Sequence, residues 1–387
     1  MSEAPPYTPQ RRIAITGTQG FLGWHLRCAI RMLGGLEVVD IDRAGFDDPA
    51  RLRAALAGVD AVVHLAGVNR GTQDEVETGN PRLARALVDA LRGCGAAPHL
   101  VFANSTHSGD QAGASVGSAT TPLTPYGRSK REATAILGEW AATTGAVFTD
   151  IRFPHLFGEG GRPFYNSAIA TFCHQLAHDE APKIGVDGEV ELLHAQRACD
   201  LILEAIESGT GGPLSPLGEP MRVSEALDRL LSMNATYADG TLPRFDTALD
   251  LELFNTLRAF RFPSHYPIQP GWRSDARGRL FEAVKTGHGG QCFASWTHPG
   301  MVRGNHFHRR KIERFLVASG EALIRVRRLF STEVHSFIVS GETPACIDMP
   351  TLHTHDIRNT GQGELFTLFW SHEIFDPSAP DTYSEAV

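Results

Sequence analysis

Five short strand-like runs, rich in β-branched residues, alternate with longer segments of helical period through the first 154 residues. The runs are RRIAITG, LEVVDID, DAVVHLAG, HLVFANS and AVFTDIRFP. Strands that alternate with helices in this way form βαβ units, whose crossovers place helices on both faces of a parallel sheet. The chain is therefore predicted to open with an α/β domain built on a parallel sheet.

The pattern changes after residue 272, where short alternating runs are separated by Gly, Pro and Asn turns. These runs are GQCFASWTH, ERFLVAS, EALIRVRRL, VHSFIVS, PACIDMP and ELFTLFW. Many short strands at even spacing predict an all-β sandwich or barrel. Before them, VSEALDRLLSMN and DTALDLELFNTLRAF are predicted helices, and RFPSHYPIQPGW, residues 261–272, is the predicted linker. We expect two domains, residues 1–262 and 263–387.

Composition limits the class of protein. The chain has 387 residues, enough for two cores, and its apolar (42%) and charged (21%) fractions are those of an ordinary globular protein. A formal charge of -8 without a long basic run gives no reason to expect nucleic-acid or membrane partners. No apolar run suits a transmembrane helix, and MSEAPPYTPQRR lacks the hydrophobic segment of a signal peptide. We expect a cytoplasmic enzyme whose six widely spaced cysteines are free thiols.

A glycine triplet follows the first strand. IAITGTQGFLG places Gly17, Gly20 and Gly23 between that strand and a helix, where glycines permit a tight turn and close approach to a pyrophosphate at the helix N-terminus. A glycine-rich turn without a ligand is the alternative. The second strand ends in VVDIDR, in which Asp42 is placed to bind the ribose hydroxyl of NAD and Arg43 to accept the 2′-phosphate of NADP. Both cofactors remain open.

The segment TPYGRSK places Tyr126 and Lys130 four positions apart on a predicted helix, where they share a face. A tyrosine with an unperturbed pKa of about 10 is a weak acid or base at neutral pH, but a neighbouring ammonium favours its phenolate. FANST, at the end of the preceding strand, offers the hydroxyls of Ser105 and Thr106 to a substrate oxygen. An ordinary surface Tyr and Lys is the alternative.

These motifs, TGxxGxxG, a Ser after the fourth strand and YxxxK, resemble those of an extended short-chain dehydrogenase/reductase over about residues 11–260. The resemblance implies a Rossmann-like doubly wound parallel sheet, a nicotinamide cofactor, Tyr126 as proton donor, Lys130 on the ribose, and Ser105 polarising a carbonyl. The cofactor contacts that it implies are Gly17, Gly20, Phe21, Leu22, Gly23, Asp42, Arg43, Leu65, Ala66, Tyr126, Lys130 and Pro154. The implied substrate contacts are Thr106, Tyr165, Asn166 and Ser167.

The C-terminal part carries a candidate metal site. His306 and His308 lie one residue apart, so on a strand they point to the same face, and Glu313 follows after a turn. MPTLHTHDIRN supplies His355 and, two residues before it, His353. Imidazoles with one carboxylate suit a divalent transition metal such as zinc. A lone histidine is more often a core or surface residue, but several from two strands favour a metal.

The spacing Gly300-x5-His306-x-His308-x4-Glu313-x6-Gly320 resembles the first cupin motif, and Pro350, His355 and Asn359 the second. Leu352 stands where that second motif usually has Gly. The resemblance covers about residues 272–387 and implies an all-β cupin (jelly-roll) barrel, with His306, His308, Glu313 and His355 as ligands of zinc or another divalent metal. A purely structural metal is the alternative. Because cupin barrels often pair through their sheets, a homodimer is expected.

The chain places a cupin-like region behind a region that resembles an extended reductase. Over nearly its whole length it is similar to the CapF-type bifunctional UDP-sugar epimerase/reductases, and the segments that carry this resemblance include YNSAIATFCHQLA, DARGRLFEAVKT and FWSHEIFDPSAPDTY. The resemblance implies C3 epimerisation of a UDP-2-acetamido-2,6-dideoxy-4-hexulose in the cupin. NADPH-dependent reduction of the C4 ketone then gives a UDP-N-acetyl-6-deoxy-L-talosamine-type product for polysaccharide precursor synthesis. Lys285 and His353 are the candidate C3 bases, and a solvated strand lysine is the alternative for Lys285. The alternatives are a reductase, 4-epimerase or dehydratase with a non-catalytic cupin, and a non-catalytic sugar or cofactor sensor.

Overall fold

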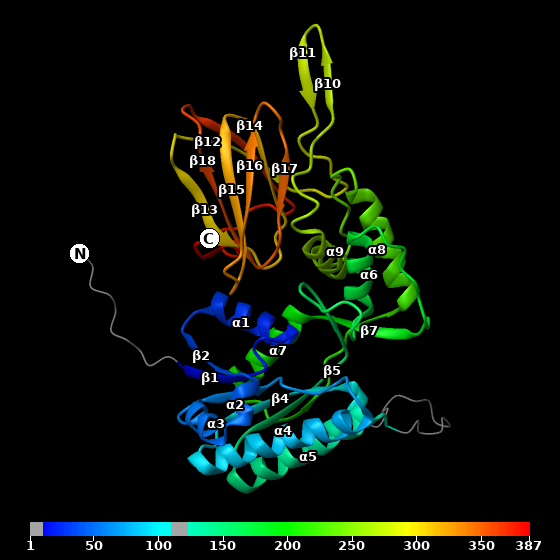
Figure 1. Ribbon diagram of the computed structural model, residues 1–387, viewed down its shortest axis with the longest axis vertical. Coiled ribbons are helices and arrows are strands. Elements are labelled where there is room, and N and C mark those ends of the chain that lie inside the picture. The colour runs from blue at the N-terminus through cyan, green and yellow to red at the C-terminus, as the bar shows by residue number, and fades with distance from the viewer. Residues whose placement is uncertain (1–10, 110–122) are drawn as a thin grey trace, which may run out of the picture. The chain divides into compact units, whose positions relative to one another are not determined.

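The computed structural model describes residues 11–109 and 123–387 (Figure 1). Its contacts divide the chain into two compact units. The first unit holds the chain up to Leu156 together with Val190–Pro220, and the second holds Phe157–Glu189 with Met221–Val387. These units differ from the predicted domains, 1–262 and 263–387, because three helices that precede residue 262 belong to the second unit.

The first unit is built on a six-stranded sheet of order β2-β1-β3-β4-β5-β8, in which each strand is parallel to its neighbours. Its strands are β1 (Arg11–Thr16), β2 (Leu36–Ile41), β3 (Ala61–His64), β4 (His99–Ser105), β5 (Phe148–Phe153) and β8 (Gly212–Leu214). The strand order reverses at β1, so β1 and β3 flank the topological switch point at which such sheets bind ligands. The prediction of a doubly wound parallel sheet is confirmed.

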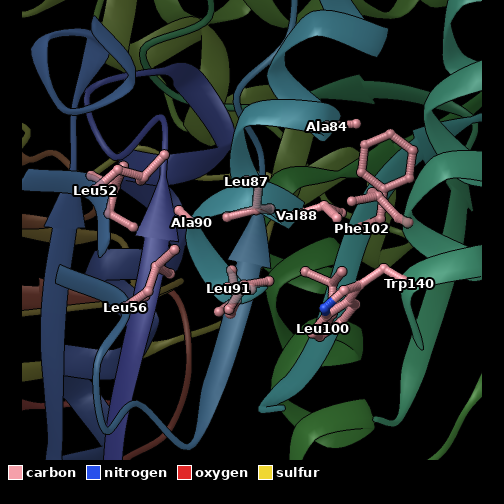
Figure 2. Close-up of a cluster of buried hydrophobic side chains, with 14 of the residues drawn as sticks. Leu52, Leu56, Ala84, Leu87, Val88, Ala90, Leu91, Leu100, Phe102 and Trp140 are labelled. Atoms are coloured by element: carbon pink, nitrogen blue, oxygen red, sulfur yellow. The ribbon is translucent and has the colours of Figure 1, made fainter. Parts of the chain in front are cut away.

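Helices cover both faces of this sheet. One face packs against α1 (Phe21–Leu33) and α7 (Ala195–Ser208), and the other against α3 (Pro49–Leu56), α4 (Gln73–Cys94) and α5 (Pro125–Thr144). Figure 2 shows Leu87 and Leu91 of α4 and Trp140 of α5 beside Leu100 and Phe102 of β4. Strands buried on both faces are apolar throughout, which explains the β-branched runs of the sequence.

Local sequence fixes the start of α5, which carries two predicted catalytic residues. Thr124 caps this helix by accepting a hydrogen bond from the backbone N–H of Gly127 at 3.1 Å, and Pro125 occupies the first helical position. Tyr126 and Lys130 consequently fall in the first two turns. Gly145, at φ +72°, ends the helix in the left-handed conformation that glycine adopts without steric cost.

The second unit contains two antiparallel sheets, of order β12-β19-β14-β17 and β16-β15-β18-β13-β20. Their strands are β12 (Gln291–Thr297), β13 (Val302–Phe307), β14 (Glu313–Ser319), β15 (Glu321–Arg328), β16 (Val334–Ser340), β17 (Cys346–Met349), β18 (His353–Asn359), β19 (Leu365–Ser371) and β20 (Tyr383–Ser384). Phe315 and Val317 of the first sheet share one core with Ile324, Val326 and Ile357 of the second. The prediction of an all-β C-terminal region is confirmed.

Shorter elements complete the chain. They are α2 (Arg43–Asp47), the 3-10 turn η1 (Thr106–Ser108), a three-stranded sheet of β6 (His155–Phe157), β7 (Glu189–His194) and β9 (Glu219–Arg222), and a hairpin of β10 (Trp272–Asp275) and β11 (Gly278–Phe281). Within the described part of the chain, all helices are too short or too polar to cross a membrane. All six cysteines are free thiols, as predicted.

The second unit also contains the helices α6 (Ala168–Ala177), α8 (Val223–Tyr237) and α9 (Ala248–Arg261), and α8 and α9 make buried polar contacts with the β region. Arg314 of β14 pairs with Asp348 of β17 at 2.6 Å, and the Tyr237 hydroxyl at the end of α8 donates to Asp348 at 2.5 Å. The predicted linker is part of the same structure, because Tyr266 is buried in the core between the sheets. Its aromatic residues form core contacts where the composition suggested a spacer.

We expect Asp348→Asn to lower the free energy of unfolding by about 3–5 kcal/mol, because it leaves the buried Arg314 guanidinium without its counter-charge. Burial alone would raise the pKa of Asp348, but attraction and hydrogen bonds from Arg314 outweigh it and hold the pKa below the ordinary value. This stabilisation is therefore present at neutral pH and lost as the pH falls through the folded pKa.

Urea denaturation at pH 7 measures the effect. The control is Asp246→Asn, which removes the same charge from an exposed ion pair with Arg244 and is expected to cost about 0–1 kcal/mol. Equal small losses in both variants would contradict a stabilising role for the buried pair.

Candidate active sites and metal centre

The glycine turn lies at the switch point of the parallel sheet. Gly17 follows β1 at φ +77°, and a Cβ there would lie 3.1 Å from the backbone nitrogen of Ala66. A Cβ on Gly23 would lie 2.3 Å from the carbonyl oxygen of Gly17, so this helix residue must also be glycine. Gly20 is the N-cap of α1. The turn thus exposes backbone at a helix N-terminus, where the helix dipole favours an anionic group.

A cavity of about 530 Å³ adjoins this turn. Six residues predicted to bind the cofactor line it, namely Gly17, Gly20, Asp42, Arg43, Leu65 and Ala66. Phe21, Leu22 and Gly23 lie in the first turn of α1 outside this lining, and Pro154 follows β5. The volume suits a nucleotide-sized ligand.

Two polar residues that the sequence analysis missed hold the loop after β3 in this lining. The Thr16 hydroxyl oxygen accepts hydrogen bonds from the backbone N–H groups of Leu65 and Ala66 at 3.1 and 3.0 Å. The Asn80 side chain accepts from the N–H of Val68 at 3.0 Å and donates to its carbonyl at 2.9 Å. Thr16 directly precedes the glycine turn, but Asn80 carries no signal in the sequence.

Asp42 and Arg43 stand at the end of β2 in different settings. The Asp42 carboxylate caps α2 by accepting from the N–H of Gly45 at 2.8 Å, and it lies 3.5 Å from the Arg51 guanidinium. Arg43 lines the cavity together with Arg82 of α4. The carboxylate is therefore partly used within the protein, while two arginines line the cavity.

Ser105, Tyr126 and Lys130 belong to the first unit. Ser105 is the last residue of β4, and its hydroxyl lies 3.0 Å from Nδ1 of His107. The His107 ring in turn lies edge-on to the Tyr126 ring, with 6.3 Å between centroids. His107 thus contacts both Ser105 and Tyr126, and its place two residues after the serine was the signal that the sequence analysis missed.

Lys130 is buried, and its ammonium donates to the carbonyl of Ala103 at 2.6 Å and lies 4.1 Å from the centre of the Phe102 ring. Burial lowers the pKa of Lys130 to about 7, against the opposing attraction of Asp150. Lys130 and Tyr126 lie four residues apart on α5, so their side chains leave the same face of this helix.

Four side chains converge in the β region of the second unit. His306 lies on β13, His308 follows that strand, Glu313 opens β14 and His355 lies on β18, so the group draws on both sheets. One nitrogen or oxygen atom from each lies within 4.8 Å of the others. The Nε2 atoms of His308, His355 and His306 are 3.2, 3.3 and 3.8 Å from Oε2 of Glu313.

The hydrogen bonds of these rings show that the group fits a cation. Nδ1 of His308 lies 2.6 Å from the carbonyl oxygen of Asp381, and Nδ1 of His355 lies 3.2 Å from that of His353. Carbonyls only accept, so each neutral ring carries its proton on Nδ1 and presents an Nε2 lone pair to the Glu313 carboxylate. The nitrogen lone pairs and the carboxylate repel one another, so this arrangement is stable only with a positive charge between them. Three imidazoles and one carboxylate suit zinc or a similar divalent metal.

Residues 13–215 match the model of the NAD dependent epimerase/dehydratase family, which is more than half of the chain. The chain belongs to this family. Its β region, residues 273–383, matches the polysaccharide biosynthesis C-terminal domain. The chain is therefore an NAD(P)-dependent enzyme of the extended short-chain dehydrogenase/reductase type, followed by a C-terminal β domain.

Two known proteins are similar to this chain over nearly its whole length, and a third over about two thirds of it. A UDP-2-acetamido-2,6-beta-L-arabino-hexul-4-ose reductase from Pseudomonas aeruginosa is 30% identical over 97% of this chain and 99% of its own. The crystal structure of capsular polysaccharide assembling protein CapF from Staphylococcus aureus is 29% identical, with a TM-score of 0.59, over 97% of this chain and 100% of its own. RMD from Pseudomonas aeruginosa, complexed with NADPH, shares the fold at 19% identity and a TM-score of 0.54, over 65% of this chain and 98% of its own.

The predicted substrate contacts lie at two places in the chain. Thr106 opens η1 directly after Ser105 and is exposed. Tyr165, Asn166 and Ser167 precede α6 in the second unit, where the Ser167 hydroxyl caps the helix by accepting from the N–H of Ala170 at 3.2 Å. Ser167 therefore has a structural task whether or not it also contacts a substrate.

Lys285 does not join the four-residue group. Its ammonium pairs with Asp239 at 2.9 Å, and it lines a cavity of about 580 Å³ together with Arg314. Arg314 follows Glu313 on β14, and successive strand residues point to opposite faces, so this cavity lies outside the sheet whose inner face carries Glu313. The position of Lys285 does not support the predicted role as C3 base. His353, the other candidate, lies two residues before His355 on the same face of β18.

Proposed function

We propose that this chain is a bifunctional nucleotide-sugar enzyme that acts twice on one UDP-2-acetamido-2,6-dideoxy-4-hexulose. The β region, as a cupin, epimerises C3, and the reductase then reduces the C4 ketone with NADPH. The observation that carries the proposal is the presence in one chain of a Ser105-Tyr126-Lys130 set and a converged three-histidine, one-glutamate group. The 30% identical relative, a reductase named for a 2-acetamido-2,6-hexul-4-ose, supports the substrate class.

In the reductase, the residues of this chain supply a proton and orient the ketone. A bound NADPH supplies the hydride that reduces C4. Tyr126 donates its hydroxyl proton to the ketone oxygen, and Ser105 donates a hydrogen bond to the same oxygen. The Lys130 ammonium lowers the pKa of the Tyr126 phenol by stabilising its phenolate. The product is the C4 alcohol, of the UDP-N-acetyl-6-deoxy-L-talosamine type.

In the β region, the C4 ketone makes the C3 hydrogen acidic, so a base can remove it and a proton returned to the opposite face inverts C3. Zinc or another divalent metal held by His306, His308, Glu313 and His355 would supply positive charge that stabilises the negative oxygen formed on deprotonation. Epimerisation must precede reduction, because the C3 hydrogen is acidic only while C4 remains a ketone. A polysaccharide precursor is the expected use of the product.

One experiment tests both halves of the proposal. The zinc-loaded protein is incubated with the UDP-4-hexulose in deuterated water, with and without NADPH, and deuterium is located by NMR and mass spectrometry. We expect deuterium at C3 without NADPH, and oxidation of NADPH with formation of the C4 alcohol when it is added. Oxidation of NADPH without deuterium at C3 would favour the alternative, a reductase whose β region holds a purely structural metal.

The preference for NADPH over NADH is proposed from the cavity lining. Arg43→Ala is expected to raise KM for NADPH about 10- to 100-fold, because a charge-assisted hydrogen bond to a phosphate is worth about 1.5–3 kcal/mol. KM for NADH should stay unchanged. Steady-state kinetics with both cofactors measure this, and Arg85→Ala, which breaks a surface pair with Glu132, is the control. Equal changes for NADH and NADPH would contradict recognition of a 2′-phosphate by Arg43.

The expected homodimer and cytoplasmic location stay predictions. Light scattering of the purified protein tests the first, and fractionation of the producing cell tests the second.

A further inference from the structure

The last residues of the chain, 380–387, run beside the metal ligands, and we call this segment the C-terminal strap. Its strand β20 pairs antiparallel with β13, setting Ser384 opposite His306 and Tyr383 opposite Phe307. The N–H of Glu385 donates to the carbonyl of Asn305 at 3.0 Å. The strap therefore extends the sheet beside the strand that carries the first histidine.

Asp381 is the strap residue with the most contacts to the ligand-bearing segment. Its carboxylate is buried and accepts three backbone hydrogen bonds, from the N–H of Arg309 at 3.0 Å, Arg310 at 3.0 Å and Lys311 at 2.8 Å. These three residues lie in the turn that joins His308 to Glu313. A carboxylate that accepts three N–H groups forms charge-assisted bonds, about twice as strong as neutral ones.

The backbone of Asp381 acts on the same segment. Its carbonyl oxygen is the 2.6 Å partner of His308 Nδ1, and the residue adopts φ +45°, a conformation in which Asp and Asn are enriched. The Lys311 ammonium returns a hydrogen bond to the carbonyl of Pro380 at 2.6 Å. One residue of the strap thus fixes both the proton position of a histidine ring and the turn between two ligands.

We propose that Asp381 is a positioning residue of the metal centre, holding His308 and Glu313 in the arrangement that binds the cation. The inference rests on the metal site of the proposed function. In other metalloproteins, groups that hydrogen-bond to the metal ligands orient those ligands, and their loss weakens metal binding about 10- to 100-fold. The strap would have the same role here.

Asp381→Asn tests this inference because it keeps size and backbone conformation. In the native protein one carboxylate oxygen accepts from Arg309 and the other from Arg310 and Lys311, so an amide must turn its NH₂ group toward at least one N–H. The turn keeps a second anchor, because the Asn255 side chain of α9 donates to the carbonyl of Arg310 at 2.9 Å. We therefore expect a folded protein with a loosened ligand set.

The control is Asp376→Asn, the same change in the same part of the chain. Asp376 is exposed and accepts only local hydrogen bonds, from the N–H and hydroxyl of Ser378 at 2.8 and 2.7 Å. The measurements are zinc affinity by competition with a chromophoric chelator, and the visible spectrum of the cobalt(II)-substituted protein. We expect Asp381→Asn to bind zinc about 10- to 100-fold more weakly and to change the cobalt spectrum, with Asp376→Asn like wild type.

Zinc affinity and a cobalt spectrum equal to those of wild type in Asp381→Asn would overturn the role of Asp381 and leave the proposed metal site intact. A wild-type protein that binds neither metal would overturn both. If Asp381→Asn does not fold, Lys311→Met decides, because it removes the side-chain hydrogen bonds from the turn to the strap, at the Pro380 carbonyl and the Thr382 hydroxyl, and leaves the Asp381 carboxylate in place. Weaker zinc binding in that variant would support a role of the strap in positioning the ligands, and unchanged zinc binding would overturn that role.

Discussion

Replacing Tyr126 by Phe is expected to lower kcat for NADPH-dependent reduction of the UDP-4-hexulose about 10²- to 10⁴-fold, the usual contribution of a positioned general acid. The change removes only the hydroxyl that would protonate the C4 oxygen, and α5 keeps its cap at Thr124 and its packing through Trp140. Single-turnover oxidation of NADPH, followed by absorbance, isolates this step from product release.

The same variant contains its own control. Exchange of deuterium into C3 belongs, in the proposed function, to the β region, so Tyr126→Phe should exchange at the wild-type rate. The affinity for NADPH should change little. A kcat within a few-fold of wild type would exclude Tyr126 as the proton donor, and a parallel loss of C3 exchange would place both reactions in one site.

Replacing His306 by Ala is expected to abolish retention of zinc and to slow C3 exchange about 10²- to 10³-fold, as loss of a group that stabilises a developing oxyanion does. The variant removes one of three imidazoles and leaves Glu313 with two. Zinc retained after dialysis is measured by elemental analysis, and exchange is followed in deuterated water without NADPH.

His298→Ala is the matched control, because His298 is an exposed histidine of the same β region that pairs with Glu364 at 3.3 Å and lies outside the four-residue group. It should retain zinc and exchange at the wild-type rate. Full C3 exchange in a His306→Ala protein free of zinc would contradict a catalytic role of the metal. NADPH oxidation by this variant is expected to persist when the substrate already has the product configuration at C3.

Short-range patterns predicted most of the fold. The β-branched runs, the glycine turn and the evenly spaced C-terminal strands depend on neighbours in sequence, and so does the pairing of His306 with His308 across one strand face. The family motif predicted that His355 would join these two histidines and Glu313. In the structure, one ligand atom of each of the four side chains lies within 4.8 Å of the others.

Long-range contacts account for what was missed. Asp381 caps a turn about seventy residues earlier, and no spacing rule connects a carboxylate with backbone N–H groups so far away. Lys285 lies in the loop after β11 and pairs with Asp239, 46 residues earlier, and no spacing along the sequence predicts that contact. Tyr266, in a segment whose composition is typical of a spacer, is buried because aromatic side chains supply large apolar area to whatever core is near.

The opposite orientations of Glu313 and Arg314 on β14 limit how this strand can vary during evolution. The first side chain faces the histidines and the second forms the buried pair with Asp348. A one-residue shift in the register of β14 would bring the Arg314 guanidinium to the place of Glu313 among the imidazoles or, in the opposite direction, the Glu313 carboxylate to the place of Arg314 beside Asp348. A shift in either direction would disrupt both the histidine group and the buried ion pair. Homologues should therefore differ in this strand by substitution, with length changes confined to the loops at its ends.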